Sequence, residues 1–230
     1  MELTKNLAFI CPKCFHIIPL KCKFTVNGLS KENDLFMNES YMRSHYICPE
    51  CKKRTHAFIC DKNIAKAVQL TNKIGYKTIF SCEGHFNRNW LEKAFAHKEK
   101  NPNYKISAFD LGTVPYIFVK GRKKLRSKLF LELCNIGFDY FDVGQSSTHK
   151  QHLKFKDQES YYELFDNPTF AFRYNPKLLE PKFNEWLEKG YTIDEIEKLF
   201  NKELRKMRKD LEKVLQNYYD LQEIGKKLEK

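Results

Sequence analysis

Two cysteine pairs with the same spacing, Cys11-Pro-Lys-Cys14 and Cys48-Pro-Glu-Cys51, constrain the fold of this 230-residue chain more than any other feature. A C-x-x-C turn holds two sulfurs at the apex of a tight hairpin, and backbone amides point toward them. Two such turns that face each other form the closed, tetrahedral four-sulfur site that Zn²⁺ prefers where its role is structural. We therefore expect Cys11, Cys14, Cys48 and Cys51 to bind one structural Zn²⁺, with no open coordination position for catalysis.

The alternative interpretation of these four residues is a set of buried or redox-active thiols. The N-terminal segment lacks the layout of a signal peptide, and no uncharged apolar run approaches the roughly 20 residues of a membrane span. We therefore expect a cytoplasmic protein with no membrane partner, in which paired cysteines bind metal rather than form disulfides. Five nearby side chains are expected to be packed strand residues, any one of which is a possible substitute ligand: His16, Cys22, His45, His56 and Cys60.

The two turns resemble the C-P-x-C-G knuckles of zinc-ribbon proteins, and the resemblance covers residues 7–60. It implies a zinc-ribbon fold for this segment. Phe15 and Lys52 stand where that family has glycine. This departure concerns the geometry of the knuckles and leaves the four expected ligands unchanged.

A second resemblance involves Gly75-Tyr-Lys-Thr, Ser81-Cys-Glu-Gly-His85 and the later Pro115-Tyr-Ile. In this order they resemble a group of uncharacterised phage and low-GC bacterial zinc-ribbon proteins, which implies no activity. The S-C-x-G core is also similar to the S-S-C-S-G-R strand of the tRNA wybutosine-synthesis methyltransferase family. There it implies a site for S-adenosylmethionine and tRNA, although Phe80 replaces the first serine and His85 the arginine.

The sequence divides into three parts, which we predict to be a zinc ribbon at 1–60, an α+β domain at 61–176 and a helical hairpin or coiled-coil extension at 177–230. Asp61 predicts the N-cap of a helix that ends near Lys73, before Gly75. Hydrophobic patterning predicts the elements that follow. In order, they are strand Lys77–Cys82, helix Trp90–His97, strand Tyr104–Phe109, strand Val114–Val119 with Pro115 at an edge or first position, helix Arg122–Asn135, strand Phe138–Val143, strand His152–Lys156, helix Glu159–Phe165 and strand Thr169–Tyr174.

An internal similarity supports the α+β assignment. Asn72-Lys-Ile-Gly75-Tyr and Asn135-Ile-Gly137-Phe each end a predicted helix with glycine and begin a strand with an aromatic residue. Two helix–strand–strand units would place helices on one face of a mainly antiparallel sheet. A common helix-to-strand turn explains the match equally well.

The last part of the chain predicts one long helix. Thr192-Ile-Asp-Glu195 is a capping box. Seven residues beyond it recur at alternating spacings of four and three, which is a heptad seam: Phe200, Leu204, Met207, Leu211, Val214, Tyr218 and Leu221, with Leu228 as a weaker member. A helix of this length is expected either to form a homodimer with a second chain or to lie across the body of its own.

The end of the strand Lys77–Cys82 is a candidate pocket, made of Ser81, Cys82, Glu83, Gly84 and His85. Glycine turns at strand ends often carry ligand contacts. Three other interpretations stay open. The C-x-x-H spacing is compatible with half of a second metal site, completed by Asp110 or His97; Cys82 is a candidate nucleophile with His85 as its base; and the segment is also compatible with an ordinary strand–turn junction.

The net charge is +12, with excesses of four, seven and one positive charges in the three successive parts. The first two parts are therefore expected to bind an anionic partner. Eight basic residues are candidate phosphate contacts: Lys120, Arg122, Lys123, Lys124, Arg126, Lys128, Lys154 and Lys156. The plainer alternative is a solvated helix face.

These features favour a non-enzymatic zinc-ribbon protein that binds nucleic acid, and RNA or single strands suit its aromatic residues better than duplex DNA. A second hypothesis is a phage-type inhibitor that binds a host defence nucleoprotein complex. The third is an RNA- or nucleotide-modifying enzyme centred on Ser81–His85. Nucleic acid or a nucleoprotein complex is therefore the expected partner.

Overall fold

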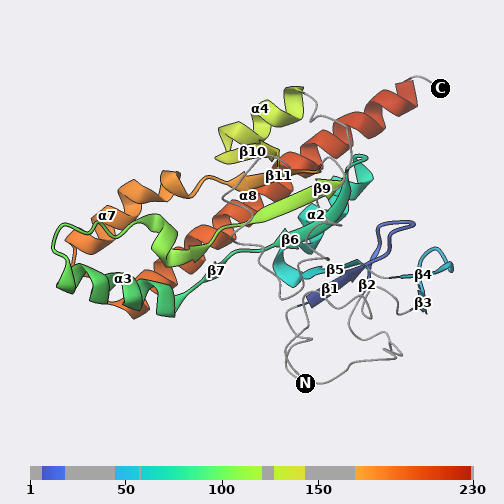
Figure 1. Ribbon diagram of the computed structural model, residues 1–230. Coiled ribbons are helices and arrows are strands. Elements are labelled where there is room, and N and C mark those ends of the chain that lie inside the picture. The colour runs from blue at the N-terminus through green and yellow to red at the C-terminus, as the bar shows by residue number, and fades with distance from the viewer. Residues whose placement is uncertain (1–6, 19–44, 57, 121–126, 143–168, 229–230) are drawn as a thin grey trace.

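The computed structural model describes residues 7–18, 45–56, 58–120, 127–142 and 169–228 (Figure 1). Helices are mixed with antiparallel sheet, four cysteines cluster near the N-terminus and one long helix forms the C-terminal part, so the expected α+β class is confirmed. The strand expected at 152–156 and the helix expected at 159–165 lie outside the described residues. Of the helices that are described, none is long and apolar enough to span a lipid bilayer.

Each cysteine turn lies between two short antiparallel strands. β1 (Leu7–Ile10) precedes the first turn and pairs with β2 (Ile17–Ile18) and with β5 (Phe58–Asp61). β3 (His45–Ile47) and β4 (Arg54–His56) flank the second turn and form a separate two-stranded sheet. β5 then continues into a 3₁₀ turn, η2 (Lys62–Ile64), and helix α2 (Ala65–Lys73).

The central sheet has four strands in the order β10-β11-β9-β6, and every neighbouring pair is antiparallel. Their bounds are β6 (Lys77–Cys82), β9 (Tyr116–Lys120), β10 (Phe138–Asp142) and β11 (Thr169–Tyr174). Helix α2 leads into edge strand β6, and helix α4 (Ser127–Asn135) leads into the other edge strand, β10. The sheet thus contains two helix–strand–strand units that meet where β9 pairs with β11.

The two helix-to-strand junctions have the same turn. Gly75 and Gly137 both have positive φ, at 97° and 86°. The Gly75 N–H donates to the Asn72 carbonyl at 3.0 Å, and the Gly137 N–H donates to the Cys134 carbonyl at 2.9 Å. Left-handed glycine is the usual end of a helix, so the expected stop at Gly75 is confirmed.

The sequence placed Pro115 at an edge or at the first position of its strand, and the structure differs from both. β9 begins at Tyr116 and is a central strand, between β11 and β6. Pro115 therefore lies just before the strand, where the lack of an N–H breaks no pairing. Its carbonyl accepts a hydrogen bond from the Tyr174 N–H at 3.0 Å.

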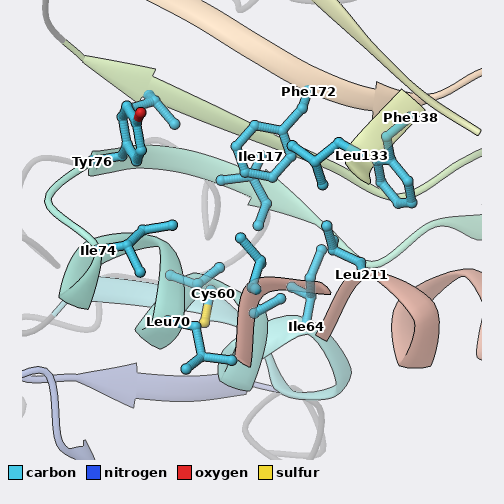
Figure 2. Close-up of a cluster of buried hydrophobic side chains, with 14 of the residues drawn as sticks. Cys60, Ile64, Leu70, Ile74, Tyr76, Ile117, Leu133, Phe138, Phe172 and Leu211 are labelled. Carbon is cyan, nitrogen blue, oxygen red and sulfur yellow. The ribbon is translucent and has the colours of Figure 1, made fainter. Parts of the chain in front are cut away.

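Helices α2, α4 and the segment of the C-terminal helix from Leu211 to Tyr218 cover one face of the sheet. Their apolar side chains meet Ile117 of β9 and Phe172 of β11 in a cluster that Figure 2 shows from the side. The N-terminal strands contribute Ala8, Ile10 and Cys60 to the same cluster. Fully burying an isoleucine such as Ile10 stabilises the fold by about 1.5–3 kcal/mol. Strands β1 and β5 thus share one apolar cluster with the central sheet.

A second apolar cluster lies at the other end of the molecule. It joins α3 (Arg88–Lys100), the 3₁₀ turns η3 (Ala108–Leu111) and η4 (Pro176–Leu179), and α7 (Glu180–Glu188). The expected strand at Tyr104–Phe109 is wrong, because η3 begins there instead. The Asp110 carboxylate accepts the Ser107 N–H at 2.9 Å, and such local bonds compete with strand pairing.

The C-terminal helix α8 (Ile193–Leu228) has 36 residues, which corresponds to a length of about 54 Å. Its capping box is confirmed, since the Glu195 carboxylate accepts the Thr192 N–H at 2.8 Å. Most of the heptad seam is buried on the chain itself: Phe200 belongs to the second apolar cluster and Leu211 to the first. In the turn after Leu211 the fully buried residue is Leu215, and the predicted Val214 is only partly buried. Beyond Tyr218 the seam emerges, and Leu221 is 49% exposed. Of the two expected arrangements, the structure has the one in which the helix lies across its own body (Figure 1).

Candidate metal centre

The two cysteine turns have the same backbone hydrogen bonds. In the first, the Cys11 N–H donates to the His16 carbonyl at 2.9 Å and the Phe15 N–H donates to the Cys11 carbonyl at 2.7 Å. In the second, the Cys48 N–H donates to the Lys53 carbonyl at 3.1 Å and the Lys52 N–H donates to the Cys48 carbonyl at 2.9 Å. The chain thus builds one knuckle twice, from segments that are separated by 33 residues between Cys14 and Cys48.

Phe15 and Lys52 adopt the left-handed backbone conformation that glycine favours. Their φ angles are 60° and 57°, and they are the two non-glycine residues with positive φ in the part of the chain that the structure describes. The left-handed region costs an ordinary residue about 1–2 kcal/mol. Two such costs at equivalent positions indicate that the knuckle geometry is imposed by the site rather than by local preference.

The four sulfurs are spaced as ligands of one ion. The Sγ atoms of Cys11 and Cys51 are 3.8 Å apart, those of Cys14 and Cys48 are 3.6 Å apart, and all four lie within 4.8 Å of one another. Four thiolates at about 2.3 Å from a tetrahedral Zn²⁺ stand about 3.8 Å apart. A disulfide requires about 2.05 Å, so these cysteines form a possible metal site and no disulfide.

Burial makes these thiols difficult to ionise without a cation. Cys11 and Cys48 are fully buried, and Cys14 and Cys51 are partly exposed. Burial raises the pKa of Cys14 to about 12 and also raises the pKa of Cys48. Since only thiolates bind metal, an ion bound at this site would have to supply the charge that stabilises them.

Among the possible substitute ligands, the surroundings of Cys60 show that it does not belong to the four-cysteine site. It is buried in the first apolar cluster, and its sulfur faces the Ala8 carbonyl at 3.9 Å. Burial raises the pKa of the Cys60 thiol well above its usual range. It is therefore a packed strand residue, as expected, whereas Cys22 lies outside the described residues.

The predicted pocket residues at the end of β6 divide into two groups. Glu83, Gly84 and His85 line an open pocket of about 490 Å³, which the sequence-based prediction did not connect with α8. The other lining residues are Asn63, Phe86, Glu197, Asn201, Arg205 and Arg208. Ser81 and Cys82 are buried and are not among the lining residues.

Asp61 is a site residue that the sequence interpretation misplaced. It precedes the helical segment, but its carboxylate makes no capping hydrogen bond. Instead, its Oδ2 accepts the Glu83 N–H at 3.0 Å and lies 3.5 Å from Nε2 of His85. The contact between His85 and the Asp61 carboxylate, together with that to Cys82, raises the pKa of His85 to about 10.

The residues expected to complete a C-x-x-H site do not do so. Asp110 bonds to Ser107, and the His97 ring stacks edge-on against Tyr104 with centroids 4.5 Å apart. Asp61 takes their place beside Cys82 and His85. The signal was an acidic residue at the end of a strand, but the sequence alone does not show that the end of β5 lies beside the end of β6.

The predicted phosphate contacts fall mostly outside the described part of the chain. Lys120 ends β9, opposite Lys77 of β6, and Lys128 is exposed in the first turn of α4. Six others, Arg122, Lys123, Lys124, Arg126, Lys154 and Lys156, lie in the ranges 121–126 and 143–168. Their grouping into one surface stays a prediction.

Comparison of the chain with models of protein families, with curated proteins and with solved structures finds no match.

Proposed function

We propose that this chain is a zinc-ribbon protein that binds nucleic acid, with RNA or single strands favoured, and that its bound Zn²⁺ is structural. The observation that carries the proposal is the spacing of four sulfurs at the edge length of a tetrahedral zinc–thiolate site. Soft thiolates favour Zn²⁺ over Mg²⁺ or Ca²⁺, which bind oxygen. Four protein ligands fill the coordination sphere, so the ion has no position for a substrate.

The structural role of zinc follows from the strands around it. β3 and β4 form a sheet of only two strands, and an isolated hairpin is at best marginally stable in water. Cys48 and Cys51 lie at its turn, and their sulfurs face those of Cys14 and Cys11 beside β1. A shared ion would therefore hold the hairpin against the β2-β1-β5 sheet.

Charge supports an anionic partner. The excess of positive residues belongs to the first two parts of the sequence, and Lys13, Lys52 and Lys53 are exposed on the knuckles themselves. Lys128 and Phe130 are both exposed on α4. Exposed cations for phosphate and exposed aromatic rings for stacking are the two kinds of side chain that bind single-stranded nucleic acid.

The zinc part of the proposal is tested by metal analysis of the purified chain. Cys14→Ser is expected to remove one equivalent of zinc and to weaken the protection of β3 and β4 against proteolysis. Cys134→Ser is the matched control, since Cys134 is exposed on α4 and belongs to neither group of candidate ligands. A folded protein with the same zinc content in Cys14→Ser as in wild type would contradict the proposal.

The nucleic-acid part is tested by fluorescence anisotropy with a labelled single-stranded RNA over a range of salt concentrations. Each phosphate contact on a single strand contributes about 0.7 to the slope of log affinity against log salt. The triple reversal of Arg122, Lys123 and Lys124 to Glu is therefore expected to reduce the slope by about 2. Reversal of three exposed residues on the charge-balanced helix α8, Lys202, Lys206 and Lys209, serves as the control.

Two outcomes would favour the other hypotheses. Absence of RNA binding together with salt-insensitive binding to a protein complex would support the phage-type inhibitor of a defence nucleoprotein. An activity on RNA or nucleotides that is lost in Cys82→Ala would support the enzyme. Either outcome leaves the zinc ribbon intact and replaces only its partner.

A further inference from the structure

Three side chains of different ligand types converge where β5, β6 and β7 (His85–Phe86) meet. Asp61 is the last residue of β5, Cys82 the last residue of β6 and His85 the first residue of β7. One carboxylate oxygen, one sulfur and one ring nitrogen all lie within 4.8 Å of one another. The four-cysteine site contributes none of these groups, so this cluster is a separate feature of the molecule.

We infer that Asp61, Cys82 and His85 form a second zinc site, with three protein ligands and one coordination position open to the pocket beside α8. One thiolate, one carboxylate and one neutral imidazole balance the charge of one Zn²⁺. Mg²⁺ and Ca²⁺ require mostly oxygen ligands, whereas Zn²⁺ accepts all three types present here.

The surrounding hydrogen bonds already orient two of the three ligands. Oδ2 of Asp61 accepts the Glu83 N–H at 3.0 Å, and Sγ of Cys82 accepts the Gly84 N–H at 3.4 Å. Thr113 Oγ1 lies 3.8 Å from the Cys82 sulfur and accepts the His85 N–H at 3.0 Å. Because Oγ1 accepts that bond, its own proton is available to the sulfur. Such outer contacts fix the direction of metal ligands and tune their basicity.

A tight turn keeps the ligands of the C-x-x-H segment close together. Gly84 has a φ of 82°, and a Cβ there would lie 2.8 Å from Cδ2 of Leu204 and 3.0 Å from the Thr113 carbonyl oxygen. Helix α8 therefore presses directly on the turn, and Arg208 of α8 donates to the Glu83 carbonyl at 2.8 Å. These contacts leave the turn little freedom to move away from Asp61.

The fit to zinc requires one small movement. Tetrahedral zinc with these donors separates them by about 3.3–3.6 Å, and His85 Nε2 already lies 3.5 Å from the Asp61 carboxylate. The imidazole is the exposed member, with 54% of its side chain accessible, so it is the ligand able to turn toward the sulfur. His85 also lines the pocket of about 490 Å³, which places the fourth coordination position toward solvent.

A nucleophilic Cys82 with His85 as its base fits the same three residues less well. A nucleophile has to reach its substrate, but Cys82 is only 8% exposed and is not among the pocket-lining residues. A simple ion pair between Asp61 and His85 would not involve the Cys82 sulfur, which lies within 4.8 Å of both groups. The nucleophile and the ion pair each predict a different zinc content or alkylation rate from that of a zinc site.

The experiment measures zinc per chain after equilibration with excess Zn²⁺ and gel filtration, by elemental analysis of the full-length protein. Wild type is expected to retain two equivalents. His85→Ala and Asp61→Asn are each expected to retain one, as is Cys14→Ser, which affects the other site. His97→Ala, a change at a histidine outside the cluster, is expected to retain two. Circular dichroism verifies that each variant is folded.

Alkylation of Cys82 by iodoacetamide, followed by peptide mass spectrometry, provides a second readout. Because Cys82 is only 8% exposed, its alkylation reports local opening of the site. Zinc is expected to slow this alkylation at least tenfold, and His85→Ala is expected to abolish the protection. Exposed Cys134 should react equally with and without zinc. One zinc per wild-type chain, lost entirely in Cys14→Ser, would refute the second site and leave the zinc ribbon in place. Rapid alkylation of Cys82 in zinc-loaded protein would also refute it and favour the nucleophile.

Discussion

Replacing Lys52 by glycine is expected to strengthen zinc binding at the four-cysteine site. Lys52 is exposed and has a φ of 57°, a conformation that costs a residue with a side chain about 1–2 kcal/mol. Glycine removes this cost, but it loses about 0.5–1 kcal/mol more conformational entropy on ordering. The net gain is therefore about 0.5–1 kcal/mol, which corresponds to about two- to fivefold tighter binding, because binding and folding of such sites are coupled.

The assay is competition for zinc between the protein and a chelator of known affinity, monitored by the absorbance of the chelator. Lys53→Gly is the matched control, since Lys53 is the neighbouring exposed lysine and has no positive φ. It is expected to bind zinc about two- to fivefold more weakly, because glycine loses more conformational entropy on ordering and no unfavourable φ angle is relieved at this position. Equal weakening in Lys52→Gly and Lys53→Gly would refute the argument that the knuckle stores strain at this position.

Three further predictions concern the body of the fold. Hydrogen bonds from Thr192 lower the pKa of Glu195, so the capping box stabilises the fold above about pH 4.5 and this contribution is lost as the pH falls through the lowered value. Glu195→Gln should thus be less stable than wild type in urea at neutral pH and equal to it in acid. Leu211→Ala is expected to cost about 2–5 kcal/mol in the same assay, and Leu221→Ala less than about 1 kcal/mol; a large, concentration-dependent effect of Leu221→Ala would instead identify the seam as an interface between chains. In Gly112→Ala, the new Cβ would lie 2.1 Å from the His85 carbonyl oxygen, so its melting temperature should fall, whereas Gly225→Ala, with no heavy atom within 4 Å, should be stabilised by about 0.5–1 kcal/mol.

Local sequence patterns predicted the parts of the fold that depend on local physics. The C-x-x-C turns, the glycine at the end of α2 and the capping box of α8 each depend on bonds within a few residues of one another. The strand Lys77–Cys82 was placed with its correct bounds, because a run of apolar and β-branched residues followed a clear helix stop. For such features the sequence contains both partners of the interaction.

Features that depend on contacts between residues far apart in the sequence were harder to predict from local patterns. An aspartate before a helix is an N-cap in most contexts, but Asp61 instead bonds to the backbone of Glu83, which follows it by 22 residues. The heptad seam of α8 identified most of its apolar face, with Val214 in place of the buried Leu215. It contained no information on whether that face would meet a second chain or the sheet. The pattern at Tyr104–Phe109 predicted a strand. The local hydrogen bond between Ser107 and Asp110 instead stabilises the start of the 3₁₀ turn η3.

The single long helix α8 packs against both ends of this molecule and fixes their relative position. Phe200 anchors α8 in one apolar cluster and Leu211 anchors it in the other, three turns of helix away. Neither cluster can open fully while α8 stays packed against both. The amide protons of the two regions should therefore exchange with solvent in a single cooperative event. A proline inserted between the anchors would divide that event into two, and the molecule would then melt as separate halves.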